Sequence, residues 1–351
     1  MPGKIRVLIV DDSPFICKAL TRIFEEDPSI EVAGVARDGK EAIEKAVALN
    51  PDVITLDIMM PEMDGIETLK VLMKTKPTPV LMLSQFTRNG AELTLNALEL
   101  GAMDFIDKSS AGVMDFYGLS KEITSKVRAI AGSKLQKISA PSPALPAYKG
   151  KGIIDVVAVG SSTGGPTALQ MLLSKFPRDI GFAVLIVQHM PHGFTGPLAR
   201  RLDSLCMVHV KEAESGDRIE PGVVLIAPSG LHLTAGPPRR AETAEERQAG
   251  IRCRVKLDVE PLDTMHRPSV DVLFSSVARR YGERCMGVIL TGMGSDGATG
   301  MKAIKEAGGA TIAQDRETST IFGMPKVAIE NNAVDRVVPI TSMAEEILKT
   351  V

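Results

Sequence analysis

The first 130 residues alternate short apolar runs with segments of helical spacing, and this alternation constrains the fold more than any other feature of the sequence. The apolar runs cover residues 6–10, 30–35, 53–56, 80–83 and 104–106. The segments with helical spacing cover residues 14–26, 40–48, 66–73, 91–100 and 121–130. Strands that alternate with helices predict a doubly wound α/β domain built on a parallel sheet of five strands.

Polar residues follow several of these strands at the point where each one ends. Asp11 and Asp12 follow the first strand, Asp57 the third and Ser84 the fourth, and Lys108 comes just after the fifth. A lone aspartate at such a place is usually a helix cap or a turn residue. Parallel winding brings all these ends together, however, and three converging carboxylates repel one another unless a hard cation such as Mg²⁺ lies among them. A lysine and a hydroxyl beside them can hold phosphoryl oxygens.

Together these residues resemble the response-regulator receiver family over residues 1–125. The resemblance implies that Asp57 is the phosphoacceptor and that its phosphorylation requires Mg²⁺. It also implies a set of metal ligands and of switch residues: Asp11, Asp12, Asp57 and the backbone carbonyl of Met59 for Mg²⁺, and Ser84, Phe105 and Lys108 for the response to phosphorylation. Phe105 keeps a second interpretation, because an aromatic residue in a short strand is more often part of the core.

A second α/β pattern starts at residue 154 and predicts a second domain. Its strand-like runs cover residues 154–159, 182–187, 223–227 and 287–290, and its helical segments cover residues 166–174, 269–279 and 297–306. Between the two patterns, the stretch SAPSPALPAYKG contains three prolines and almost no charge, which is typical of a semi-rigid linker. We therefore expect a receiver domain at residues 1–125, a linker at 126–150 and a second domain at 151–351. Residues 237–250 are polar and charged, and they predict a surface loop or hairpin of unknown role.

The second domain opens with a strand, a glycine-rich turn and a helix. Residues Gly160 to Gly164 fit G-x-S-x-G, the nucleophile-elbow pattern, with Ser162 at its centre. Glycines suit such a turn because it needs unusual backbone angles and close approach of the chain. The N-terminus of the following helix favours developing negative charge. Similar turns also bind phosphates, so anion binding is a rival interpretation.

A nucleophilic serine needs a base, and the chain has five histidines. His189 directly follows an apolar strand, so we expect it at the same edge of the sheet as Ser162. His192, three residues further along the loop, is the main alternative. The other histidines fit other roles: a structural role for His209 and His232, and substrate binding for His266, which precedes a predicted helix.

The base in turn needs an acid that orients it. Asp296 follows the strand 287–290 and stands among glycines, which indicates a loop; its alternative role is to cap the next helix. Asp271 is the rival acid, in the first turn after a Ser269 cap, where the helix dipole already favours a carboxylate. The order serine, histidine, aspartate differs from the order in true α/β-hydrolases. We therefore expect a hydrolase-like α/β domain with a mainly parallel sheet but a different fold.

Six segments of the chain together resemble the chemotaxis protein-glutamate methylesterase family: GSSTGGP, QHMP, IAP, HRPSVDVLF, GVILTGMGSDG and FGMP. With the receiver in front, the resemblance covers essentially the whole chain. It implies a phosphorylation-regulated serine hydrolase that cleaves glutamate methyl esters on chemoreceptors and also deamidates glutamine, with no cofactor for ester cleavage. It implies these roles: Ser162 as nucleophile, His189 as general base, Asp296 as orienting acid, the Met293 N–H as oxyanion donor, and Thr163 as a residue that orders the site.

The resemblance also implies the partners, which are the cytoplasmic helices of methyl-accepting chemoreceptors and a chemotaxis histidine kinase. The start of the chain lacks a long apolar h-region, and the cysteines indicate no disulfide framework, so we expect a cytoplasmic location. A net charge of −2 without a basic stripe argues against nucleic acid as a partner. No apolar run reaches the ~18 residues of a membrane span, so we expect no membrane insertion. The four cysteines form no C-x-x-C pair, which argues against a zinc site. The main alternative is a receiver that controls a non-enzymatic binding module; a DNA-binding output ranks below it.

Overall fold

The chain forms two compact units that divide between Ile138 and Ser139. The computed structural model describes residues 3–84, 88–108, 116–133, 154–237 and 253–351. Most of the predicted linker and almost all of the predicted surface loop at 237–250 lie outside these residues. Within the described ranges, no helix is long and apolar enough to span a membrane.

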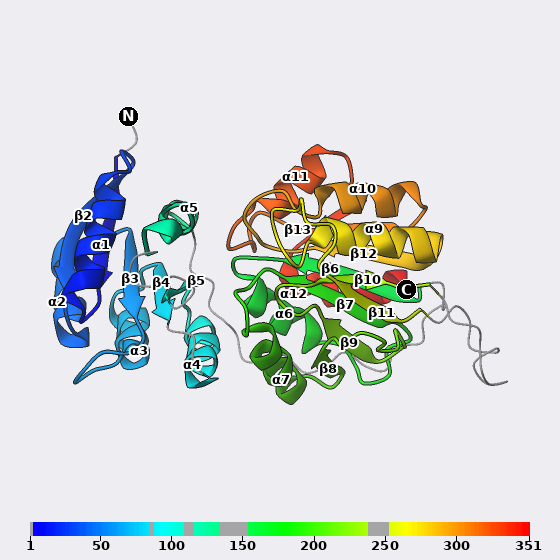
Figure 1. The fold of residues 1–351 in the computed structure, drawn as a ribbon, viewed down its shortest axis with the longest axis horizontal. Helices are drawn as coiled ribbons and strands as arrows, with labels where there is room; N and C mark the ends of the chain where they lie inside the picture. Colours follow the sequence, from blue (N-terminus) through cyan, green and yellow to red (C-terminus); the bar gives the residue numbers. More distant parts are fainter. Residues whose placement is uncertain (1–2, 85–87, 109–115, 134–153, 238–252) are drawn as a thin grey trace. The chain divides into compact units, whose positions relative to one another are not determined.

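The first unit is a sheet of five parallel strands in the order β2-β1-β3-β4-β5, with helices on both faces (Figure 1). Helix α1 contacts α5 on one face, while α2, α3 and α4 pack in a row on the other. The predicted doubly wound receiver sheet is confirmed, and α5 continues through the domain boundary predicted at residue 125. The elements are β1 (Ile5–Val10), α1 (Pro14–Glu25), β2 (Ile30–Ala36), α2 (Gly39–Leu49), β3 (Val53–Asp57), α3 (Gly65–Thr75), β4 (Val80–Ser84), α4 (Arg88–Glu99), β5 (Asp104–Asp107) and α5 (Ser120–Ile130).

The second unit is a sheet of seven parallel strands in the order β14-β13-β12-β6-β7-β9-β8, with a separate antiparallel pair, β10-β11. Its predicted mainly parallel α/β architecture is confirmed. The strands are β6 (Val156–Ser161), β7 (Ala183–Gln188), β8 (His209–Glu212), β9 (Val223–Ile226), β10 (His232–Ala235), β11 (Val255–Asp258), β12 (Cys285–Ile289), β13 (Ala310–Gln314) and β14 (Arg336–Val338). The helices are α6 (Gly165–Leu173), α7 (Thr195–Leu205), α9 (Val270–Tyr281), α10 (Ala298–Glu306), α11 (Met324–Glu330) and α12 (Ile340–Thr350).

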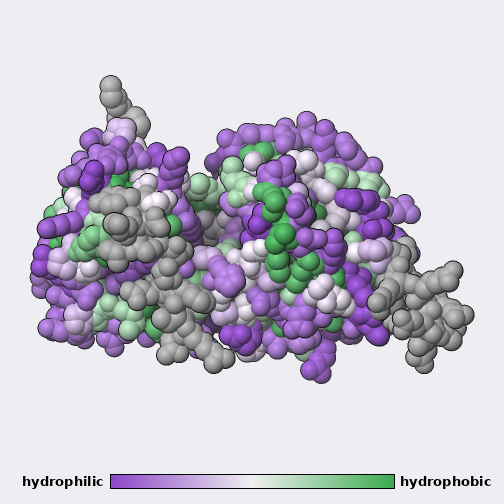
Figure 2. Space-filling view, viewed as in Figure 1, coloured by the Kyte–Doolittle hydropathy of each residue, from purple (hydrophilic) through white to green (hydrophobic). Residues whose placement is uncertain are grey.

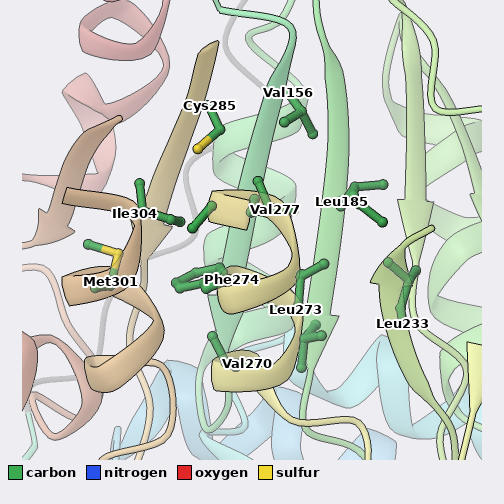
Figure 3. Packing of buried hydrophobic residues seen from close by; sticks show 14 of the residues in the cluster. Val156, Leu185, Leu233, Val270, Leu273, Phe274, Val277, Cys285, Met301 and Ile304 are labelled. Atoms are coloured by element: carbon green, nitrogen blue, oxygen red, sulfur yellow. The ribbon is translucent and has the colours of Figure 1, made fainter. Parts of the chain in front are cut away.

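Helix α9 is held against the centre of this sheet by an apolar stripe. Val270, Leu273, Phe274 and Val277 recur at positions i, i+3, i+4 and i+7, and all four are fully buried. They lie in one cluster with residues of β6, β12 and α10, as Figure 3 shows for Val156, Cys285, Met301 and Ile304. This packing places the N-terminus of α9 at the carboxyl edge of the sheet, where β6 and β12 end.

Candidate active site

Ser162 lies in the turn between β6 and α6, at the carboxyl edge of the sheet. Gly164 caps α6 with a φ of +77°, a backbone conformation that glycine adopts without strain. Gly160 packs against α9 so closely that an added Cβ would lie 2.3 Å from Val270 Cγ1. The two glycines thus serve the two purposes expected of them, an unusual backbone angle and a close approach.

His189 stands beside Ser162 because of the register between two neighbouring parallel strands. Ser161 at the end of β6 pairs with Gln188 at the end of β7, and the His189 N–H donates to the Ser161 carbonyl at 3.0 Å. The ring of His189 then reaches Asp296, with Nε2 2.8 Å from Oδ2. The structure therefore brings the predicted serine, histidine and aspartate to one edge of the sheet.

The two ring nitrogens of His189 have different surroundings. Nε2 is taken by the Asp296 carboxylate, whereas Nδ1 is buried and has no hydrogen-bond partner. The Ser162 hydroxyl makes no hydrogen bond within the described residues either. A buried polar atom without a partner costs about 1–3 kcal/mol. Nδ1 is therefore the ring nitrogen of His189 that the contact with Asp296 leaves unused.

Asp296 is kept ionised by donors at the start of α9. Its Oδ1 accepts from the Ser269 hydroxyl at 2.9 Å and the Asp271 N–H at 3.0 Å, and its Oδ2 accepts from the Val270 N–H at 2.8 Å. Burial alone would raise the pKa of Asp296, but the hydrogen bonds from His189 and from the backbone of Asp271 and Val270 outweigh it and lower the pKa to about 2. A fixed anion at this place orients the imidazole of His189.

The rival acid, Asp271, faces a different helix. Its Oδ1 accepts from the Gly300 N–H at 2.6 Å, so it caps the start of α10. Asp296 caps the start of α9. Its alternative role predicted instead that it caps α10, the helix that follows it in sequence. Each aspartate thus caps the other's helix, and of the two it is Asp296 that also contacts His189.

The other histidines differ clearly from His189 in their surroundings. His192, the alternative base, is exposed and has no hydrogen-bond or ion-pair partner in the described part of the chain. His209 contacts Asp203 on the surface at 3.0 Å. His232 is fully buried and accepts the Ser269 N–H through Nδ1 at 3.1 Å, which agrees with a structural role.

His266 lies closer to the base than its sequence position implied. Its ring stacks on that of His189, with centroids 4.2 Å apart and planes 25° from parallel. Burial, together with the charge of the neighbouring His189, lowers the pKa of His266. The His266 ring thus packs against one face of the His189 imidazole.

The loop between β12 and α10 lies against the nucleophile turn. The Ser162 N–H donates to the Thr291 carbonyl at 3.1 Å, and the Thr291 hydroxyl donates to the Thr163 carbonyl at 3.0 Å. Two residues further on, the Met293 N–H has no hydrogen-bond partner among the described residues. It is therefore free to donate to an oxyanion that forms beside Ser162.

Gln188 is a site residue that the sequence motifs did not identify. Its buried side chain donates through Nε2 to the carbonyls of Ser162 and His189, at 2.9 Å each, and its Oε1 accepts from the Ser161 hydroxyl at 2.7 Å. One amide group thus connects the backbone of Ser162 to that of His189. Its place directly before His189 in QHMP was the only signal for it.

In the first unit, the predicted carboxylates also converge. Oxygens of Asp11, Asp12 and Asp57 lie within 4.8 Å of one another, and Lys108 Nζ is 3.1 Å from Asp11 Oδ2 and 2.8 Å from Asp57 Oδ1. Burial raises the pKa of Asp57 to about 6, with Lys108 opposing this shift and the charge of Asp11 adding to it. Three clustered oxygen donors fit a hard divalent cation.

The remaining predicted receiver residues lie around this cluster. Ser84 is buried at the end of β4, and its hydroxyl accepts from the Thr94 hydroxyl of α4 at 2.7 Å. Phe105 is buried in β5, where Lys126 of α5 donates to its carbonyl at 2.7 Å and lies 5.6 Å from its ring centre. Met59 follows β3 with an exposed side chain.

Known families and relatives match both halves of the chain. Residues 157–347 match the CheB methylesterase family, and residues 7–113 match the response regulator receiver domain. A protein-glutamate methylesterase/protein-glutamine glutaminase of Archaeoglobus fulgidus is 46% identical over 98% of this chain and 97% of its own. The protein of the same name from Halalkalibacterium halodurans is 44% identical over 99% of both chains. The solved CheB methylesterase catalytic domain of Thermotoga maritima is 39% identical over 56% of this chain and 99% of its own, with a TM-score of 0.52.

Proposed function

This chain belongs to the CheB methylesterase family, and we propose that Ser162, His189 and Asp296 carry out its hydrolytic reaction. The chain is a protein-glutamate methylesterase and glutaminase with a receiver domain. The contact between His189 and Asp296 carries the assignment of the three residues, because an anion-binding turn has no need of a histidine oriented by a carboxylate. The non-enzymatic binding module is therefore the weaker alternative.

The reaction begins with attack of the Ser162 hydroxyl on the ester carbonyl of a glutamate side chain. His189 accepts the serine proton through Nδ1, while Asp296 holds Nε2 and stabilises the imidazolium. The Met293 N–H donates to the oxyanion, and the imidazolium then protonates the leaving methanol. Water attacks the acyl-enzyme with His189 again as base, which restores the serine and releases glutamate. A glutamine side chain passes through the same steps and releases ammonia.

The regulatory site is the carboxylate cluster of the receiver, with Asp57 as phosphoacceptor and Asp11, Asp12 and the Met59 carbonyl as further ligands for Mg²⁺. A bound Mg²⁺ offsets the negative charge of the carboxylates and the phosphoryl group. Ser84 and Lys108 bind phosphoryl oxygens after transfer.

The signal leaves this cluster through two helices. Thr94 connects Ser84 to α4, and Lys126 connects Phe105 to α5. A movement of Ser84 is therefore passed directly to α4, and a movement of Phe105 is passed directly to α5.

The partners follow from the family and from the receiver. We propose that the substrates are methylated glutamates on the cytoplasmic helices of chemoreceptors, that a chemotaxis histidine kinase is the phosphodonor, and that the protein works in the cytoplasm. The test is methanol release from methylated receptor membranes, together with labelling of Ser162 by a fluorophosphonate. Absence of both methanol release and labelling would leave the binding module as the better explanation.

Phosphorylation of Asp57 is expected to raise the rate of methanol release, because we propose that the unphosphorylated receiver inhibits the hydrolase by covering its site. The linker keeps the receiver near the hydrolase at high effective concentration, so a weak contact is enough to cover the site. The fragment 151–351 should therefore be faster than the unphosphorylated whole chain, and Asp57→Asn should stay at the low rate with any phosphodonor. Initial rates of all three proteins, with and without phosphodonor and Mg²⁺, measure this. A fragment no faster than the whole chain would mean that the receiver activates the hydrolase directly or delivers it to receptors.

Gln188→Glu is expected to lower kcat by about 10- to 100-fold, as small displacements of reacting groups do. Glutamate keeps the shape and can still accept from Ser161, but it loses the N–H donors to the carbonyls of Ser162 and His189. KM should change little, because the side chain is buried away from the substrate. Steady-state methanol release gives kcat and KM, and a thermal melt of the same samples shows whether the loss of kcat results from unfolding. A change in KM alone would assign Gln188 to substrate binding instead.

A further inference from the structure

The loop at residues 259–268, between β11 and α9, carries several apolar side chains that are exposed to solvent. Val259 is 44% exposed, Leu262 60% and Met265 92%. Figure 2 shows apolar residues gathered in a stripe on the second unit, where Figure 1 draws this loop in yellow. We call Val259, Leu262 and Met265 the apolar rim. Single exposed apolar residues are ordinary, but a group of them on one loop marks an interaction surface.

The loop that carries the apolar rim is anchored to the body of the unit. The buried His232 contacts the Pro261 carbonyl through Nε2 at 3.1 Å and accepts the Ser269 N–H through Nδ1 at 3.1 Å. The Gly230 N–H donates to the Arg267 carbonyl at 3.0 Å. With both ends held, the loop keeps its apolar side chains exposed at a cost in hydration free energy. The rim is therefore a preformed surface.

Met265 links the apolar rim to the candidate active site. Met265 directly precedes His266, the residue whose ring stacks on His189. Met265 and His266 line one cavity of about 840 Å³ together with Asp296. A ligand that binds at Met265 therefore lies beside the cavity that His266 and Asp296 also line.

We propose that the apolar rim binds the polypeptide that carries the ester, through apolar side chains that flank the esterified glutamate. The inference rests on the proposed function and extends it to substrate recognition. The carbonyl carbon of a glutamate side chain lies only about 4 Å from its own Cα, as the bond lengths dictate. Ser162 can reach that carbon only if the substrate backbone lies across the mouth of the site.

The chemistry of the ester also favours apolar recognition. A methyl ester carries no charge, so it offers basic side chains nothing to pair with. Burial of neighbouring apolar surface is then the main attraction available close to the ester. In a helical substrate, the residues on the same face are three or four positions away from the glutamate. The partner we assign to the rim is thus a polypeptide with apolar residues at those positions.

Met265→Asp in the full chain with saturating phosphodonor tests this proposal. We expect kcat/KM for methanol release from methylated receptor membranes to fall about tenfold, mainly through KM, as for a residue near the centre of an interface. The rate at which a small fluorophosphonate labels Ser162 should fall by less than about twofold, because the probe has no polypeptide to place on the rim. The matched control is Met207→Asp, at another exposed methionine that lies beyond the end of α7, and it should change neither rate.

Three results would overturn the proposal. Equal losses in labelling and methanol release would mean that the loop only shapes the catalytic base. No loss in either would mean that the substrate does not touch the rim. A higher rate without phosphodonor would mean that the rim instead binds the receiver of the same chain. Failure of the proposed function is distinguishable, because the unaltered protein would then show no labelling of Ser162.

Discussion

Ser162→Ala is expected to lower methanol release by at least about 10⁴-fold while the protein stays folded. Among the described residues, no other hydroxyl has the position of Ser162, which directly follows β6, lies next to His189 and contacts the β12–α10 loop. The Ser162 backbone N–H and carbonyl make the contacts that hold the turn, and alanine keeps both. Methanol release from methylated receptor membranes and circular dichroism of the same samples measure the two parts of this expectation.

Ser161→Ala is the matched control for that substitution. The Ser161 hydroxyl is fully buried and donates to Gln188, so its loss leaves the amide oxygen with one partner fewer. We expect a loss of about 1 kcal/mol in the free energy of unfolding and a rate within about tenfold of the unaltered protein, since the amide still holds both carbonyls. Equal rate losses from the two alanine variants would reject Ser162 as the nucleophile.

The receiver cluster could be predicted from sequence because it depends only on strand order and strand ends. Asp11 and Lys108 each follow a strand and Asp57 ends one, and parallel winding places all such ends at one edge. This topology brings Lys108 close enough to form ion pairs with both aspartates. The same reasoning placed Ser162 and His189 together, since they follow adjacent strands of the second sheet.

Other parts of the second unit depend on packing that short sequence patterns do not encode. The strands β8 and β14 are short and contain at most one buried residue each, so no buried apolar run marks them. The pair β10-β11 joins segments separated by a long polar stretch. The crossed capping of α9 by Asp296 and of α10 by Asp271 follows from the way the two helices pack. A capping preference could predict that each aspartate caps a helix, but not which one.

His189→Gln is expected to lower methanol release by at least about 10³-fold, since the triad loses its proton acceptor. Glutamine can still donate to the Asp296 carboxylate, but it cannot carry the serine proton. His192→Gln should change the rate by less than about threefold, because this exposed side chain has no carboxylate to orient it among the described residues. Both variants are measured on the same membranes with saturating phosphodonor, so that the state of the receiver does not enter the comparison.

The result that would contradict this assignment is a reversal of the two histidine effects. The base would then be His192, and the contact of His189 with Asp296 would be structural, with a buried Nδ1 left unpaired for no catalytic purpose. A purely structural role predicts that the main effect of His189→Gln is a loss of fold stability, because the contact with Asp296 would then serve only the fold. A large rate loss with unchanged stability therefore identifies His189 as the base, and the unpaired Nδ1 as the position that the serine proton occupies during the reaction.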